Sequence, residues 1–187
     1  MNTQNPNQPF ANMTRNTVMN MMMTQSLFEL YKQFPNAAEV PIAPLDEVST
    51  LHIECAQLSK ALIDEECNKE LLPALDAYIK SPSRENLQEV FDGVIDTIYV
   101  CFQLCYMLEL PFDSGFAEVH ANNLKKIQYG EDGKLAKRAD GKLMKPEGHP
   151  KPDLWEVLEQ HSNEVAYSRK TLGADNWKAG DVEGELT

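Results

Sequence analysis

The fold class is decided by residues 83–110, whose sequence is SRENLQEVFDGVIDTIYVCFQLCYMLEL. Within this stretch, apolar side chains recur every three or four residues and fall on one side of an α-helix. They are Leu87, Val90, Phe91, Val94, Ile95, Ile98 and Phe102. Ser83 is a favourable N-cap residue, and Pro111 interrupts the pattern at the far end. The stretch therefore predicts one long helix from about Ser83 to Leu110.

The opposite side of this helix is acidic. Its carboxylates follow the spacing i, i+4, i+7, i+11 and so share a face. They are Glu85, Glu89, Asp92 and Asp96. A stabilising surface helix would pair such acids with Lys or Arg one turn away, and none is present here. Residues 94–108 are apolar nearly all round, which predicts that they are buried on most sides. A buried carboxylate without a partner is costly, so Asp96 is expected to have a cation or a strong donor.

A second acidic group lies in the preceding helical pattern, which extends from about Asp46 to Tyr78. Its members are Asp64, Glu65, Glu66 and Glu70. Glu66 and Glu70 share a helix face, about 6 Å apart along the axis. A short turn at SPSREN would allow the two helices to lie antiparallel with their acidic groups face to face. Gly93 would leave room there for a close approach.

Converging carboxylates repel one another unless a cation lies between them. Oxygen-only ligands favour a hard divalent cation, Mg²⁺ or Mn²⁺, over zinc. Mg²⁺ keeps several waters and binds substrate phosphates, so such a site indicates a phosphate ester or anhydride as substrate. A solvated acidic face without any ligand is the alternative, and the 83–110 helix taken alone favours that alternative.

The remaining chain adds shorter elements. A methionine-rich segment predicts an amphipathic helix over Thr17–Phe34, and a further helix is expected over about Asp113–Ile127. Two Asp-Gly turns predict a small hairpin or ordered loop over 129–151, followed by a short helix at 152–161.

Together these elements predict an all-α fold, a helical bundle of about four to five helices with a small C-terminal hairpin or loop appendage. The domain is expected over 15–161, between a flexible N-terminus at 1–14 and a polar C-terminal tail at 162–187.

Composition narrows the function. The net charge of −12 and the pI near 4.7 argue against a general nucleic-acid binder, which needs basic stripes to neutralise phosphates. No uninterrupted apolar run reaches about 18 residues, and no signal peptide is visible, so we expect neither a membrane protein nor a secreted one. The four cysteines form no CxxC pair, which favours free thiols in a reducing cytoplasm.

Three segments resemble the all-α NTP pyrophosphohydrolase superfamily, the MazG-like and phosphoribosyl-ATP pyrophosphohydrolase-like group, and particularly its phage-encoded members. The segments are LIDEECNKELLPAL, LQEVFDGVIDTIYV and FAEVHANNLKK. The family pattern is Glu-Glu-x-x-Glu on one helix and Glu-x-x-Asp on the next. Glu65-Glu66 opens the first element, and Glu89 with Asp92 matches the second. The chain departs from the pattern at the third glutamate, because Lys69 stands there.

The resemblance extends over roughly 58–154 and includes His120, Asn123, Lys126 and the later DGK repeats. It implies a cytoplasmic enzyme, in the host cytoplasm if phage-encoded, that assembles as a homodimer or homotetramer. With Mg²⁺, or Mn²⁺ in its place, the enzyme would hydrolyse an NTP or dNTP to the monophosphate and pyrophosphate.

The resemblance also implies a set of site residues. Glu65 and Glu66 would be catalytic, with Glu70 taking the place of the third family glutamate. The metal ligands would be Glu66, Glu70, Glu89, Asp92 and Asp96. Asn123 and Lys126 would bind substrate, although both can equally be exposed polar residues near a helix end. Lys134 and Lys142 either close over the triphosphate or only make the hairpin soluble.

Two other protein classes compete with this hypothesis. A carboxylate-bridged di-iron bundle needs Glu-x-x-His pairs on its helices, and no histidine of this chain has a glutamate three positions before it. A non-enzymatic helical interaction module, with the acids as a solvated face, stays open from the sequence.

Overall fold

The computed structural model describes residues 25–34, 40–43, 50–127, 129 and 135–172 of the chain. Over these residues every regular element is a helix, so the predicted all-α fold is confirmed. The contacts divide the chain into two compact units, Met1–Leu110 and Pro111–Thr187, and each unit is described by itself.

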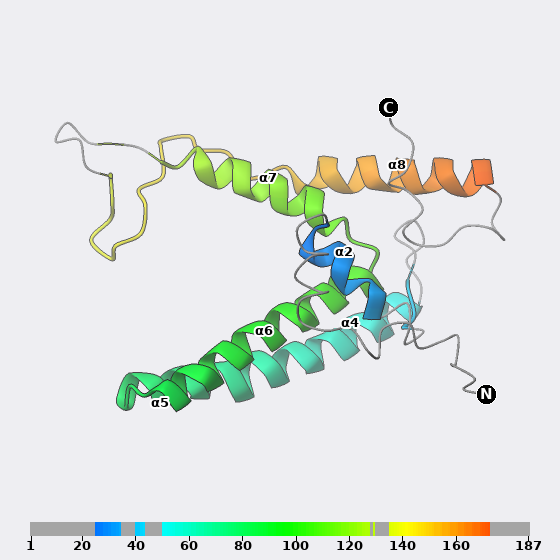
Figure 1. Cartoon of the computed structure of the whole chain (residues 1–187). Helices are drawn as coiled ribbons and strands as arrows, with labels where there is room; N and C mark the ends of the chain where they lie inside the picture. Colours follow the sequence, from blue (N-terminus) through cyan, green and yellow to red (C-terminus); the bar gives the residue numbers. More distant parts are fainter. Residues whose placement is uncertain (1–24, 35–39, 44–49, 128, 130–134, 173–187) are drawn as a thin grey trace, which may run out of the picture. The chain divides into compact units, whose positions relative to one another are not determined.

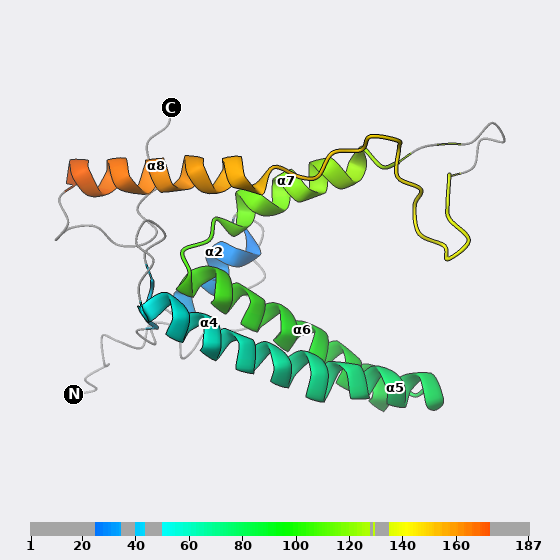
Figure 2. The ribbon, with the colours of Figure 1, turned by 180° about the vertical axis from the view of Figure 1, so that it is seen from behind.

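The first unit is built on a hairpin of long helices (Figures 1 and 2). Its first arm is continuous: α4 (Thr50–Ile63) leads into the π-helix η1 (Asp64–Leu71), which leads into α5 (Leu72–Lys80). After a short turn, α6 (Arg84–Met107) returns along all three elements. The expected long helical patterns are thus confirmed in their described parts.

The start of α6 follows the sequence prediction. The Ser83 hydroxyl accepts a hydrogen bond from the Asn86 backbone N–H at 3.1 Å and so satisfies a donor that the first helical turn leaves unpaired. In the other arm, Pro73 stands in the first turn of α5, where its missing N–H is tolerated.

Aromatic packing joins a short N-terminal helix to the end of this hairpin. The helix α2 (Leu27–Tyr31) buries Phe28 and Tyr31. The Phe28 ring lies 5.5 Å from that of Phe102, and the Tyr31 ring lies 4.8 Å from that of Tyr99. Of the helix predicted over Thr17–Phe34, only the later part is helical: residues 25 and 26 are not helical, and α2 begins at Leu27 because Ser26 is an extended N-cap. The methionine-rich part, 17–24, lies outside the described residues.

Burial of α6 differs from the prediction. Val100, Tyr106 and Met107 are buried, but the exposed fractions of Ile95 and Ile98 are 46% and 43%. The expectation that 94–108 is buried on most sides is therefore wrong for its first part. The physical reason is that few helices pack against α6. In the described part of this unit, the first arm covers one side of α6, and α2 contacts it near its end.

The length of α6 and its apolar composition also meet the requirements of a membrane span, with a mean hydropathy of 1.3. It is the one helix in the described part of the chain that does so. One such helix is weak evidence for a membrane protein, because core helices of soluble proteins pass the same test.

The second unit pairs α7 (Phe112–Leu124) with α8 (Leu154–Leu172). The predicted short helix at 152–161 is longer than expected, and the part of the tail up to residue 172 is helical. Val165, in this otherwise polar part of the tail, is buried with 3% exposure.

Between α7 and α8 lies the predicted appendage. Two isolated antiparallel bridges join Tyr129 to Leu135 and Lys137 to Leu143. The second bridge is closed by a turn in which Gly141 has a φ of 81°, a conformation that favours glycine. The turn predicted at 132–133 lies outside the described residues.

A buried asparagine ties this loop to α7. The Asn122 side chain is 3% exposed, donates to the Pro150 carbonyl at 3.0 Å and lies 2.9 Å from the His149 Nε2 atom.

Replacing Asn122 with alanine leaves the Pro150 carbonyl without this donor. We expect a loss of about 1–3 kcal/mol in the free energy of unfolding, measured by urea titration. The neighbouring exposed Asn123→Ala is the control and should cost under about 0.5 kcal/mol; equal losses would contradict a specific role for Asn122.

Candidate metal centre

In the acidic part of the hairpin the backbones of its two arms lie very close together. Gly93 of α6 is buried, and a Cβ atom at this position would lie 3.0 Å from the Leu71 Cα atom. Such a contact is tighter than nearly all Cβ contacts in proteins, so a larger residue at position 93 would force the backbone of Leu71 to shift. The predicted close approach beside the acids is confirmed.

Three carboxylates meet at this crossing. Glu66 and Glu70 come from η1 and Asp96 from α6, and one oxygen of each lies within 4.8 Å of the other two. Glu66 and Asp96 are half-buried, whereas Glu70 is exposed. Three negative charges at such separations repel one another, and a divalent cation of oxygen preference would neutralise them. The donor set is chemically suited to Mg²⁺ or Mn²⁺.

The repulsion affects the pKa of Glu66. Burial raises the pKa of its carboxyl above the ordinary value, and four neighbouring carboxylates raise the pKa further. These neighbours are Glu70, Asp96, Glu65 and Asp92, in decreasing order of effect. A bound cation would reverse this effect, because it stabilises the ionised form.

A groove of about 380 Å³ lies beside the three carboxylates, between α5 and α6. Glu70 belongs to both the carboxylate group and the groove wall, and Glu89 and Asp92 line the groove from α6. Gly93 forms part of its floor. The five predicted metal ligands are therefore divided: three gather at the crossing and two face the adjoining groove.

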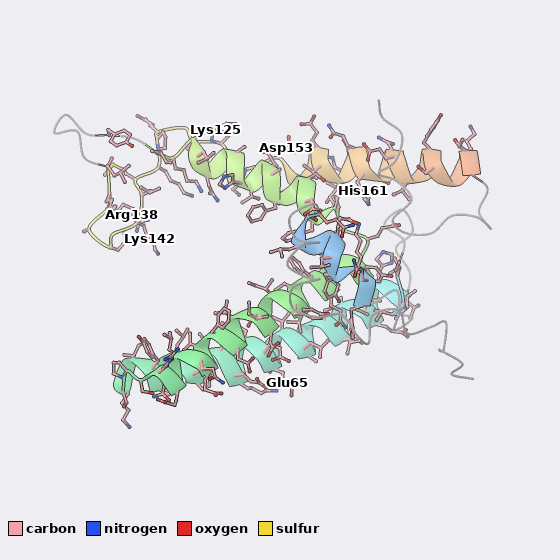
Figure 3. All side chains as sticks on the ribbon, in the orientation of Figure 1. Glu65, Lys125, Arg138, Lys142, Asp153 and His161 are labelled. Carbon is pink, nitrogen blue, oxygen red and sulfur yellow. The ribbon has the colours of Figure 1, made fainter. Side chains whose placement is uncertain are left out.

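Two charged residues of η1 lie outside the cluster. Glu65 is exposed, and Figure 3 places it on the side of the first arm that faces away from α6. The Lys69 ammonium pairs with Asp64 at 3.2 Å. Lys69 is therefore directed to a carboxylate outside the cluster.

The predicted substrate-binding residues lie in the second unit. The Lys126 ammonium donates to the Asn123 side-chain carbonyl. Lys142 and Arg138, both labelled in Figure 3, pair with Asp140 at 3.9 Å and 3.0 Å. Lys134 lies outside the described residues.

Sequence reasoning missed two polar residues. Asn86 lines the groove, and its side-chain amide donates to the Ser81 carbonyl at 2.8 Å. Its spacing of three residues before Glu89 and seven before Gly93 could have placed it on the groove face.

His149 was missed because its contact with Asn122 joins residues 27 apart in the sequence. Burial lowers the pKa of His149, and Lys126, Lys145 and Lys125 lower it further.

Comparison with known proteins found no matching family model and no matching curated sequence.

Proposed function

We propose that this protein is a Mg²⁺-dependent nucleoside triphosphate pyrophosphohydrolase. The observation that carries the proposal is the convergence of Glu66, Glu70 and Asp96 from two helices to within 4.8 Å. A carboxylate-only group at the edge of an open groove suits a hard cation that keeps free positions for water and phosphate oxygens.

In this proposal Glu66, Glu70 and Asp96 would hold the cation at the helix crossing. The ion would lower the pKa of a bound water and neutralise the charge of the triphosphate. Glu89 and Asp92 face the groove, where they would orient a water or hold a second ion, and Glu66, within the carboxylate group, would take up the proton of the attacking water. Water attacks the α-phosphorus and the α–β anhydride bond breaks, which yields a nucleoside monophosphate and pyrophosphate.

The resemblance adds Asn123 and Lys126 as candidate phosphate-binding residues, and the local excess of basic residues adds Lys134 and Lys142. The proposal also places the protein in the cytoplasm, where nucleoside triphosphates and millimolar-range Mg²⁺ are present.

The test is incubation of the purified chain with separate NTPs and dNTPs in Mg²⁺. Pyrophosphate and monophosphate are expected as products, and EDTA should stop their release. Asp96→Asn should lose activity, whereas Glu85→Gln, an exposed acid at the start of the same helix, should keep it. Orthophosphate as the only product would exclude the pyrophosphohydrolase proposal, and the absence of any product would favour the helical interaction module.

We further propose that the active form is a homodimer joined through the exposed apolar side chains of α6. Phe91, Ile95 and Ile98 are 66%, 46% and 43% exposed. Their spacing of three and four residues places them on one helix face, and exposed apolar faces of this kind mark interaction surfaces.

An ammonium group placed in this face should break the dimer. We expect Ile98→Lys to elute as a monomer in size-exclusion chromatography with light scattering, because a buried lysine in the interface would lack a partner. Ile79→Lys is the control, since Ile79 is 75% exposed at the far end of α5. A wild-type chain that is monomeric at micromolar concentration would refute the dimer.

A further inference from the structure

The acidic segment Asp64–Leu71 is a π-helix set between two regular α-helices. Its hydrogen bonding is explicit at the end, where the Leu72 N–H donates to the Cys67 carbonyl five residues earlier. An i→i+5 bond encloses one more residue than the i→i+4 bond of an α-helix. Such segments are rare and unfavourable, and they frequently occur at functional sites. The segment that carries Glu66 and Glu70 therefore contains more residues per turn than the α-helices on either side.

The ion pair of Lys69 depends on this geometry. Lys69 and Asp64 are five residues apart, and their charged atoms lie 3.2 Å from each other. In a regular α-helix, residues five apart point roughly 140° away from each other and do not pair. A regular α-helix would instead place Lys69 on the same face as Glu66, which lies three residues earlier. The Lys69 ammonium could then reach the carboxylate cluster.

The charges around Glu66 agree with an outward-directed lysine. Each of the charged neighbours that shift its pKa is a carboxylate. The Lys69 and Asp64 side chains are 67% and 50% exposed, so their pair lies on the solvent side of η1. The side-chain amide of Asn68, which is also exposed, donates to Asp64 at 2.9 Å.

We propose that the π-helical turn holds one residue in excess of a regular helix and directs Lys69 outward to Asp64, so that its ammonium stays off the Glu66–Glu70–Asp96 cluster. The excess residue is a property of the backbone and stands without any activity. Its consequence for cation binding rests on the proposed function.

Deletion of one residue tests the backbone part. Without Lys69, the segment can close as a regular α-helix while α4 and α5 keep their registers on α6. The thermal midpoint should be unchanged or higher, within about 3 °C of wild type or above it. Deletion of Ala61, an exposed residue of the regular helix α4, is the matched control. It rotates one arm against the other and should lower the midpoint by about 10 °C or more. Equal losses in both deletions would overturn the proposal.

Cation binding tests the position of Lys69. Mn²⁺ affinity of the full chain is measured by titration calorimetry for wild type, Lys69→Ala and Lys60→Ala, the latter an exposed lysine of α4. An outward Lys69 predicts dissociation constants within about twofold for both variants, as for exposed charges in general. Binding about tenfold tighter in Lys69→Ala alone would overturn the outward placement. If the wild type does not bind Mn²⁺, the proposed function fails, and the two deletions still decide whether the turn holds an excess residue.

Discussion

Replacing Gly93 with alanine is expected to lower the free energy of unfolding by about 1–3 kcal/mol. The new Cβ would meet the Leu71 Cα at 3.0 Å and the Leu71 backbone nitrogen at 3.2 Å. Both are backbone atoms, which cannot move aside as a flexible side chain would. The clash outweighs the gain of about 1 kcal/mol that alanine brings to a helix over glycine. The shift of the urea midpoint measures the effect.

Gly115 offers the matched control in another helix. A Cβ at that position would find its nearest contact, the Leu154 Cδ2 atom, at an ordinary 3.9 Å. Gly115→Ala should therefore raise stability by about 0.5–1 kcal/mol, through helix propensity and a less flexible unfolded chain. If Gly93→Ala is also stabilising, then the close crossing of η1 and α6 is not as described.

Glu66→Gln should have the largest effect on activity. We expect pyrophosphate release to fall at least about 100-fold, because the amide is a weaker ligand for a hard cation and removes one of three converging charges. Glu85→Gln removes an equal charge from the exposed start of α6 and serves as the control. The measurement is the rate at saturating Mg²⁺ for each variant; equal activities of Glu66→Gln and wild type would remove Glu66 from the site.

Without metal, the same substitution should stabilise the protein. The folded-state pKa of Glu66 is raised above its ordinary value of 4.5, so the folded state binds this proton more tightly than the unfolded chain. The resulting stabilisation is fully present below 4.5 and is lost as pH rises through the raised folded-state pKa. In EDTA at neutral pH, Glu66→Gln should therefore unfold at a higher temperature than wild type, and its stability should vary less over this pH window. Mg²⁺ should stabilise the wild type more than the variant.

Local signals made the helices and part of the site predictable. The apolar period, the Ser83 cap and the acid spacing of α6 each follow from a few neighbouring residues. Glu66, Glu70 and Asp96 could be selected because uncompensated acids on facing helices need a cation. The burial of α6 could not be predicted in the same way, since it depends on how many other helices cover it.

The π-helix had no signal in the sequence. Over eight residues, apolar periodicity does not distinguish i→i+5 from i→i+4 bonding, and both arrangements place Glu66 and Glu70 on one face. The π-helical segment ends at Leu71, which lies against Gly93, and a contact between residues 22 positions apart leaves no trace in local periodicity. For the same reason the sequence does not show that Lys69 pairs with Asp64, five residues away.

The helical hairpin has a consequence for how the chain folds. Its two arms, from Thr50 to Met107, are consecutive in the sequence and are joined by a short turn at 81–83. Contacts near the turn join residues close in the sequence, whereas at the open end Ser59 and Met107 are 48 positions apart. The hairpin can therefore close from its turn, where the contacts are local and local contacts favour fast folding. The carboxylate crossing can thus be assembled during synthesis, before the residues after Met107 have left the ribosome. Metal would then meet ligands that are already in place.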